Sequence, residues 1–334
     1  MSTSLHFFQR VAAALTRGSV AIATVIHTNG STPREVGAKL MLCEHGDTFG
    51  TIGGGAGEAK VLRQAQMVLQ TGQAQIVMVD LSGAPNREIQ GICGGQMQVW
   101  VARWQGEDAI AIAQQIVESL ERGTAITLTV PLQAGELPMV SSADFTAMAS
   151  APAAECFQET LLPSPLLLIV GAGHCGIQLA KAAHFAGFRI MVQDDRPEWA
   201  SPENFPQAER LFHGSMGEVV EAIAHHSQLY AALVTRGIDY DLPALKALIT
   251  RQPSCTYLGM IGSQKRVNKA LQVLQAEGVD PDAFPALHAP IGLNIGALTP
   301  EEIAISICSE LIMVRRGGTG DSLSRKCLGT RKSN

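Results

Sequence analysis

Residues 166–195, LLLIVGAGHCGIQLAKAAHFAGFRIMVQDD, decide the fold of the second half of the chain. The run at 166–170 is apolar throughout, which is typical of a strand buried on both faces of a parallel sheet. It leads into the G-x-G-x-x-G turn at 171–176 and then into a helical pattern that stops at Gly187. A second strand follows over 188–193 and ends on two aspartates. Strand, glycines, helix, strand and acid in this order predict a unit of the Rossmann type.

The three glycines of the turn have separate tasks in such a unit. Gly171 permits the tight turn, Gly173 lets backbone amides approach a pyrophosphate, and Gly176 allows close packing of helix on strand. Asp194, with Asp195 beside it, stands where an acid would accept hydrogen bonds from a ribose 2′-hydroxyl. Fold does not imply function, however. The alternative is a doubly wound scaffold whose glycines now serve only packing.

The pattern continues beyond this unit. Strands near 166–170, 188–193, 210–213, 231–235 and 255–261 alternate with helical segments, which predicts a parallel sheet built from βαβ units. The fold class that we predict for the second half is therefore α/β, with a Rossmann-like doubly wound parallel sheet.

The sequence pattern of the first half predicts an α/β domain of mixed strands. Its expected helices lie at 4–17, from about 58 to 70, and at 107–121. Its expected strands are 20–28, 38–43, 49–52, 75–81, 96–104 and 124–130.

Composition and capping signals indicate the domain boundaries. The sequence from 131 to 164 is rich in Ala, Ser and Pro. The last helix should begin at a capping box of Thr299 and Glu302. We predict an N-terminal domain at 1–150, a linker at 151–164, a Rossmann-like domain with a C-terminal helix at 165–316, and a disordered tail at 317–334.

Charge and cysteine content exclude several classes of protein. The 334 residues are 46% hydrophobic and 16% charged, with a net charge of −5, so no basic face exists for nucleic acid. Seven cysteines without a C-x-x-C pair fit a reducing compartment better than a disulfide framework. Neither a signal peptide nor a membrane span is visible. We expect a cytoplasmic protein with no nucleic-acid or membrane partner.

Two loops of the first half are candidates for anion binding. Gly53, Gly54 and Gly55 stand at a strand-to-helix junction and precede Glu58, so several backbone N–H groups can face an anion. The alternative is a crowded turn in which side chains do not fit. Arg34 lies in the middle of a polar loop between two strands and can supply a cation.

A third candidate is the segment Cys93-Gly94-Gly95. A thiol flanked by glycines on a loop is accessible to a ligand, and nearby Arg87 would favour the thiolate. The alternative for a single cysteine is a small buried hydrophobic residue.

A fourth candidate lies after the last long strand. Ser263 can cap a helix that carries Lys265 and Arg266 in its first turn, where cations oppose the helix dipole and call for a nearby anion. The alternatives are a solvated helix start and a salt bridge to a neighbouring strand. His174, in the first turn of the fingerprint helix, can touch a ligand but can equally cap or pack.

Recognisable catalytic motifs are lacking. The chain has no G-x-S-x-G elbow, no H-E-x-x-H and no P-loop, and His225-His226 has no third metal ligand at usable spacing. We assign no catalytic residue, and we expect a factor without turnover of its own rather than an enzyme.

Several motifs together suggest a family. They are TVIHTNGSTPR at 24–34, GTIGGGAGE at 50–58, CGG at 93–95, the fingerprint glycines with Asp194-Asp195-Arg196, YLGMIGSQKR at 257–266 and PIGLNIGALTPEE at 290–302. In these the chain resembles, over nearly its whole length, the xanthine dehydrogenase accessory proteins of the XdhC/CoxI family.

The resemblance implies a maturation factor. Such proteins bind the molybdenum cofactor, as molybdopterin or its dinucleotide form, and protect it. They assist its sulfuration and deliver it to a xanthine dehydrogenase-type enzyme, with a cysteine desulfurase as the source of sulfur. A homodimer is plausible on the same ground. A pterin phosphate would suit Gly53–Gly55, Arg34, Lys265 and Arg266, and a soft thiolate at Cys93 would suit molybdenum.

The chain departs from the family at two positions. Ala56 replaces a cysteine of many relatives, so the resemblance does not imply a two-thiol site. Arg236 stands where relatives often have histidine, and it would face the Rossmann crevice and add a phosphate contact.

Two other functions stay open at this point. One is an NAD(P)-dependent oxidoreductase, or another nucleotide-binding protein, which rests on the fingerprint and Asp194. The other is a protein–protein adaptor whose Rossmann domain is only a scaffold.

Overall fold

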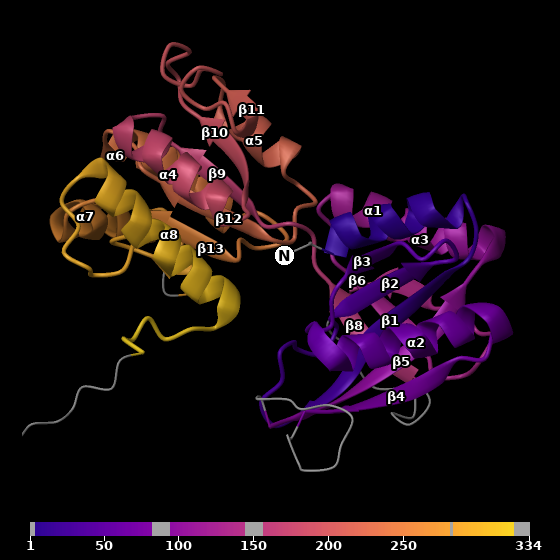
Figure 1. The fold of residues 1–334 in the computed structure, drawn as a ribbon. Helices are drawn as coiled ribbons and strands as arrows, with labels where there is room; N and C mark the ends of the chain where they lie inside the picture. The colour runs from indigo at the N-terminus through magenta and orange to yellow at the C-terminus, as the bar shows by residue number, and fades with distance from the viewer. Residues whose placement is uncertain (1–3, 82–93, 144–155, 281–282, 324–334) are drawn as a thin grey trace, which may run out of the picture. The chain divides into compact units, whose positions relative to one another are not determined.

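The computed structural model describes residues 4–81, 94–143, 156–280 and 283–323, which form two compact units (Figure 1). Unit 1 is Met1–Ser164 and unit 2 is Pro165–Asn334. The division falls where the expected linker ends. None of the described helices is long and apolar enough to span a membrane.

The core of unit 1 is a five-stranded sheet in the order β3-β2-β1-β5-β4, with every neighbouring pair antiparallel. The strands are β1 (Val20–Asn29), β2 (Lys39–Cys43), β3 (Thr48–Gly50), β4 (Gln75–Asp80) and β5 (Gln96–Trp104). Alternate residues point to opposite faces of a strand, so β1 serves two cores. Ala21, Ala23 and Val25 pack with helix α2 (Gly55–Thr71), whereas Val20 and Ile22 pack with α1 (Ser4–Leu15) and α3 (Gly106–Glu121).

Unit 1 also contains a three-stranded antiparallel sheet, in the order β7-β6-β8. Its strands are β6 (Ile126–Pro131), β7 (Met139–Ser142) and β8 (Cys156–Leu161). The linker expected at 151–164 therefore needs correction, because β8 pairs with β6 along its whole length. The six residues CFQETL carry little hydrophobic alternation, and their pairing partner is distant in sequence, so no local signal marked them as a strand.

An ion pair ties the two sheets of unit 1 together. Lys39 on β2 donates to the carboxylate of Glu159 on β8, and the two side chains are only 8% and 12% exposed. Lys39 also donates to the carbonyl oxygen of Gly37 at 3.2 Å.

Unit 2 has the predicted Rossmann-like doubly wound architecture. Its six parallel strands follow the order β11-β10-β9-β12-β13-β14, which is the dinucleotide-fold order 3-2-1-4-5-6. The strands are β9 (Leu166–Val170), β10 (Arg189–Gln193), β11 (Ala208–Phe212), β12 (Leu229–Leu233), β13 (Tyr257–Met260) and β14 (Leu287–His288). Only β14, two residues long, had no counterpart among the strands expected from the sequence.

Helices cover both faces of this sheet (Figure 1). On one face lie α5 (Met216–Ala222), α6 (Ile238–Ile249) and α7 (Gln264–Ala276), and on the other α4 (His174–Phe185) and α8 (Pro300–Arg316). The capping box of Thr299 and Glu302 starts α8, and Gly317 ends it at a φ of 66°. Of the expected tail, residues 317–323 are described and residues 324–334 lie outside the described part.

Removal of Lys39 should destabilise unit 1. In Lys39→Met the nearly buried carboxylate of Glu159 loses its cation, and we expect the free energy of unfolding to fall by about 3 kcal/mol in urea titrations. The double variant Lys39→Met/Glu159→Leu should regain most of that loss. Lys246→Met breaks a pair with Glu277 whose side chains are 41% and 45% exposed, so it should cost less than about 1 kcal/mol. Equal stabilities of the two single variants would contradict this account.

Candidate functional site

Three loops of unit 1 meet at one end of its five-stranded sheet. Asn29, at the end of β1, pairs with Gln96, at the start of β5, and Gln96 pairs with Asp80, at the end of β4. At the same end, Leu40 near the start of β2 pairs with Gly50 at the end of β3. The loops that follow β1 and β3 and the segment that precedes β5 are therefore neighbours. They carry the three glycine-rich or basic motifs expected to bind a ligand.

These loops can touch because glycines stand at their points of contact. A Cβ on Gly53, whose φ is 132°, would lie 2.4 Å from Cγ of Pro33. A Cβ on Gly95 would lie 2.3 Å from the carbonyl oxygen of Ser31. Real Cβ atoms do not approach other atoms so closely, so both positions require glycine. The loop at 30–34 thus contacts the Gly53 loop on one side and Gly95 on the other.

The Gly53–Glu58 loop already holds an anion, which is its own glutamate. Oε2 of Glu58 accepts hydrogen bonds from the Thr51 hydroxyl at 2.6 Å, the Ile52 amide at 3.0 Å and the Gly54 amide at 3.1 Å. The amides of Ile52 and Gly54 are therefore unavailable to a ligand while Glu58 stays in place, and the Gly53 amide donates to the Thr51 hydroxyl oxygen at 3.0 Å. Glu58, expected as a cofactor contact, organises the loop from within.

The chemistry of Glu58 follows from those contacts. Partial burial opposes ionisation of the carboxyl, but the donors on Thr51, Ile52 and Gly54 outweigh it and lower the pKa of Glu58. The carboxylate form is the one that the loop stabilises.

Three glycines of these loops have open space beside the backbone. Gly54 and Gly55 have φ values of 76° and 67°, and Gly94 has 74°. A Cβ at any of these three positions would meet nothing within 4 Å. Glycine is required there by backbone conformation, and a ligand can approach the backbone closely. Cys93 and Arg87 lie outside the described residues.

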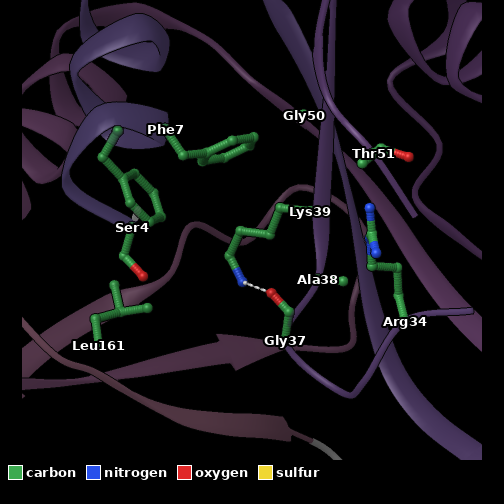
Figure 2. A pocket seen from close by; sticks show the side chains of 10 residues that line it. Ser4, Phe7, Arg34, Gly37, Ala38, Lys39, Gly50, Thr51 and Leu161 are labelled. Atoms are coloured by element: carbon green, nitrogen blue, oxygen red, sulfur yellow. Dashed lines mark hydrogen bonds between the residues drawn. The ribbon is translucent and has the colours of Figure 1, made fainter. Parts of the chain in front are cut away.

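Arg34 lines a pocket of about 200 Å³ beside this loop (Figure 2). Figure 2 shows its guanidinium directed toward Thr51, while Lys39 points toward Gly37. Phe7 forms part of an apolar wall. The one hydrogen bond recorded for the Arg34 side chain among the described residues goes to the Pro33 carbonyl oxygen at 3.3 Å. Because no described carboxylate pairs with it, Arg34 can offer its charge to an anion.

The glycine turn of unit 2 has the close contacts expected of a Rossmann unit. A Cβ on Gly176 would lie 2.2 Å from the carbonyl oxygen of Gly171, and one on Gly171 would lie 2.6 Å from that of Val234. Gly173 has nothing within 4 Å of the position that its Cβ would take.

Asp194 does not stand free for a ribose. Its Oδ2 accepts from the Ala172 amide at 2.7 Å, and its carboxylate also accepts from Nε and Nη2 of Arg196, both at 2.8 Å. Its side chain is only 4% exposed. Burial opposes ionisation, but the bonds from Arg196 and Ala172 outweigh it and lower the pKa of Asp194 to about 2. The acid at the end of β10 clamps the glycine turn instead of offering its oxygens to solvent.

Arg266 is also engaged within the chain. Its Nε donates to Oδ2 of Asp241 at 2.8 Å, and its Nη2 donates to the hydroxyl of Thr235 at 2.8 Å. Asp241 is fully buried, and the salt bridge explains why a cation occupies the first turn of α7. Ser263 caps this helix by accepting from the Arg266 amide at 3.4 Å, as predicted, and Lys265 is exposed.

The remaining two candidates of unit 2 lie at its surface. His174 is exposed and packs edge-on against Trp199, with ring centroids 5.4 Å apart. Arg236 forms a bidentate pair with Asp195.

Sequence reasoning missed two residues that the structure makes important. Asp241 is a buried acid among apolar residues of an amphipathic helix, and such a position requires a cation, which was the available signal. Lys39 carried no signal, because its partner Glu159 lies on a strand that was not recognised. Among the described residues, no group of three or more His, Cys, Asp or Glu side chains could hold a metal ion.

Family comparisons match both halves of the chain. A model described as the XdhC Rossmann domain matches residues 167–311. A model described as the XdhC and CoxI family matches residues 14–80.

Three curated relatives align over about nine-tenths of the chain. An uncharacterized protein of Escherichia coli K12, YqeB, is 29% identical over 301 residues, and the chain spans 44% of its length. A protein of Bacillus subtilis 168 described as a probable subunit of xanthine dehydrogenase is 23% identical over 316 residues, which are 88% of this chain and 93% of that protein. The molybdenum cofactor insertion chaperone PaoD of E. coli K12 is 22% identical, over 92% of this chain and 86% of PaoD.

A crystal structure described as a xanthine dehydrogenase from Bacillus halodurans has a similar fold. Its TM-score is 0.73 at 24% identity, and the match covers 96% of this chain and 98% of that one. This likeness shows the fold.

The loop at Gly53–Glu58 should lose stability when Glu58 loses its charge. In Glu58→Ala three donors lose their acceptor, and we expect unit 1 to be destabilised by about 1–2 kcal/mol at pH 7. Because the folded state lowers the pKa of Glu58, this stabilisation is complete above the ordinary glutamate value and disappears as pH falls through the lowered value. Urea unfolding of both proteins between pH 7 and pH 3 should show the difference shrinking. A difference independent of pH would contradict this role of the carboxylate.

Asp194→Asn should destabilise unit 2 in a pH-dependent way. The pKa falls from an ordinary 3.8 to about 2, which corresponds to about 2 kcal/mol of stability at pH 7. This contribution is present above pH 3.8 and is lost as pH falls toward 2, so wild type and variant should converge in acid. Thermal unfolding measured from pH 7 to pH 3 tests this. Asp195→Asn, one residue away and 49% exposed, serves as the control and should change stability much less.

Proposed function

The chain belongs to the XdhC and CoxI family, and we propose that it binds the molybdenum cofactor and prepares it for a xanthine dehydrogenase-type molybdoenzyme. The descriptions of two relatives support this: one is a molybdenum cofactor insertion chaperone and the other a probable component of xanthine dehydrogenase. The match covers only 44% of YqeB, so YqeB offers no guide to a whole-protein activity.

The meeting of three loops at one end of the unit 1 sheet carries the proposal. Gly54, Gly55 and Gly94 leave open space above the backbone, and Arg34 has no carboxylate partner among the described residues. A pterin phosphate needs amide donors and a cation. The amides of Gly54 and Gly94 donate to Glu58 and to the Leu81 carbonyl oxygen. Among the described residues of these loops, the Gly55 amide, for which no acceptor is recorded, and Arg34 can meet that need. Cys93 immediately precedes Gly94 in the sequence, and we include it in the proposal on that ground.

In this proposal the residues of the unit 1 loops have different roles. Arg34 and the Gly55 amide hold the phosphate, the open space at Gly54 admits it, and Glu58 keeps the loop in its binding shape. Cys93, as a thiolate, contacts molybdenum, because soft sulfur ligands suit such a metal. The cofactor itself supplies the redox chemistry of the client enzyme after transfer. The chain binds and hands over, without turnover of its own.

The finer steps belong to the same proposal. We propose that the bound cofactor receives its terminal sulfido ligand from a cysteine desulfurase while it is held, and that the chain then delivers it to the client. We also propose a cytoplasmic homodimer. The mass of the bound pterin distinguishes molybdopterin from its dinucleotide form.

An NAD(P)-dependent oxidoreductase has less support. That function needs an acid at the end of β10 to accept hydrogen bonds from a ribose, and both oxygens of Asp194 already have donors from Arg196 and Ala172.

Analysis of bound cofactor tests the proposal. The full chain, expressed in a host that makes the cofactor, should elute from gel filtration with molybdenum and pterin, quantified by mass spectrometry and pterin fluorescence. Cys93→Ala should lose molybdenum, and Arg34→Gln should retain pterin about tenfold more weakly, because one charge-assisted contact is removed. Cys43→Ala is the matched control, since Cys43 is a partly buried thiol of β2. Wild-type protein free of pterin, or equal molybdenum in the two cysteine variants, would refute the proposal.

A further inference from the structure

The crevice at the switch point of the unit 2 sheet is bridged by an ion pair. Asp195 follows β10 and Arg236 follows β12, and β9 lies between these two strands in the sheet. Nη1 of Arg236 donates to Oδ1 of Asp195 at 2.9 Å, and Nη2 donates to Oδ2 at 2.8 Å. The pair therefore spans the end of β9, where Gly171 opens the glycine turn. Ligands of doubly wound sheets enter at this point.

Little space remains beneath the pair. The cavity that Asp195 and Arg236 line together with Val170, Gly171 and Thr235 has a volume of about 30 Å³. That is room for a water molecule and far below the volume of a nucleotide site. A ligand larger than a water molecule can fill this cavity only if the ion pair moves.

The two aspartates of the crevice differ in how firmly they are held. Asp194 is buried and receives bonds from Ala172 and Arg196, as described above, and Nη1 of Arg236 lies 3.6 Å from its Oδ1. Asp195 is 49% exposed, and its recorded partner among the described residues is Arg236. Exposed ion pairs contribute little to stability, so Asp195 can exchange its partner at little cost.

Arg236 would keep its place without Asp195. Its guanidinium carbon lies 3.8 Å from the centroid of the Tyr240 ring, and Nη2 donates to the Tyr240 hydroxyl. A stacked guanidinium presents its planar fork in a fixed direction, and that fork matches a phosphate as well as a carboxylate. Opening of the pair therefore exposes a preorganised phosphate donor at the mouth of the crevice.

We propose that Arg236 is a binding residue for a phosphate-bearing ligand in this crevice, and that Asp195 is its built-in competitor. In the ligand-free chain the Asp195 carboxylate occupies the Arg236 fork and closes the crevice. When the ligand binds, its phosphate takes the place of the carboxylate and the crevice opens. The inference concerns unit 2 alone and does not depend on the proposed function of the unit 1 loops.

Binding of ADP and of inorganic pyrophosphate to the full chain, measured by isothermal titration calorimetry, tests this inference. Asp195→Asn removes the competing charge at nearly constant size and should tighten binding by up to about fivefold, the most that an exposed ion pair usually contributes. Arg236→Gln should weaken binding at least about tenfold, because the charged fork is lost. Tighter binding of ADP than of pyrophosphate would identify a nucleotide ligand, and equal binding would identify a simple diphosphate.

Matched controls separate these effects from general changes of charge. Arg210→Gln removes an exposed arginine that also stacks on an aromatic ring, that of Phe212 at 4.4 Å, but on strand β11. Glu221→Gln removes an exposed carboxylate of α5. Both should bind ADP as wild type does. The proposal is overturned if Asp195→Asn binds neither probe, if it binds no more tightly than wild type, or if Arg236→Gln matches Arg210→Gln.

Discussion

Close approach of other segments to the backbone at glycine positions is the constraint on which both units depend. In unit 2, Gly176 lets α4 begin directly against the turn at Gly171, where a Cβ would come within 2.2 Å of a carbonyl oxygen. In unit 1, Gly95 and Gly53 let the loop at 30–34 lie between two other loops. Side chains at these positions would push the segments apart, and the loops that carry the candidate site would no longer meet. The glycines of the motifs therefore act first on packing, and through packing on function.

A second feature is common to the two units: the chain supplies its own carboxylates to groups that could bind an anion. Glu58 accepts from the amides of the glycine loop, Asp194 from the amide of Ala172, Asp195 from Arg236, and Asp241 from Arg266. These partners differ in burial, from the fully buried Asp241 to the half-exposed Asp195. Buried pairs are structural, because their opening would leave a charge without water or partner. Exposed ones can yield to a ligand. The burial of the carboxylate partner thus distinguishes cations that stabilise the fold from cations that remain able to bind an anionic ligand.

This distinction changes the interpretation of unit 2. The fingerprint, taken by itself, suggests a dinucleotide enzyme, yet its acid clamps the glycine turn and an ion pair bridges its crevice. Unit 1, by contrast, keeps Arg34 without a carboxylate partner among the described residues and keeps open backbone at Gly54, Gly55 and Gly94. This contrast supports the proposal that the cofactor binds at the end of the antiparallel sheet of unit 1 and not at the Rossmann crevice of unit 2.

The sequence by itself determined the Rossmann unit, because its signals are local: an apolar run, three glycines at fixed spacing, a helix and an acid all lie within residues 166–195. The same holds for the capping box at Thr299 and for most helices and strands of both units. Tertiary structure alone decided which charged side chains have a partner of opposite charge and which do not. Asp241 reaches Arg266 and Glu159 reaches Lys39 across long stretches of chain, and β8 is a strand only because β6 offers it hydrogen bonds. Such pairings depend on which segments the fold brings together, and no local pattern of residues encodes them.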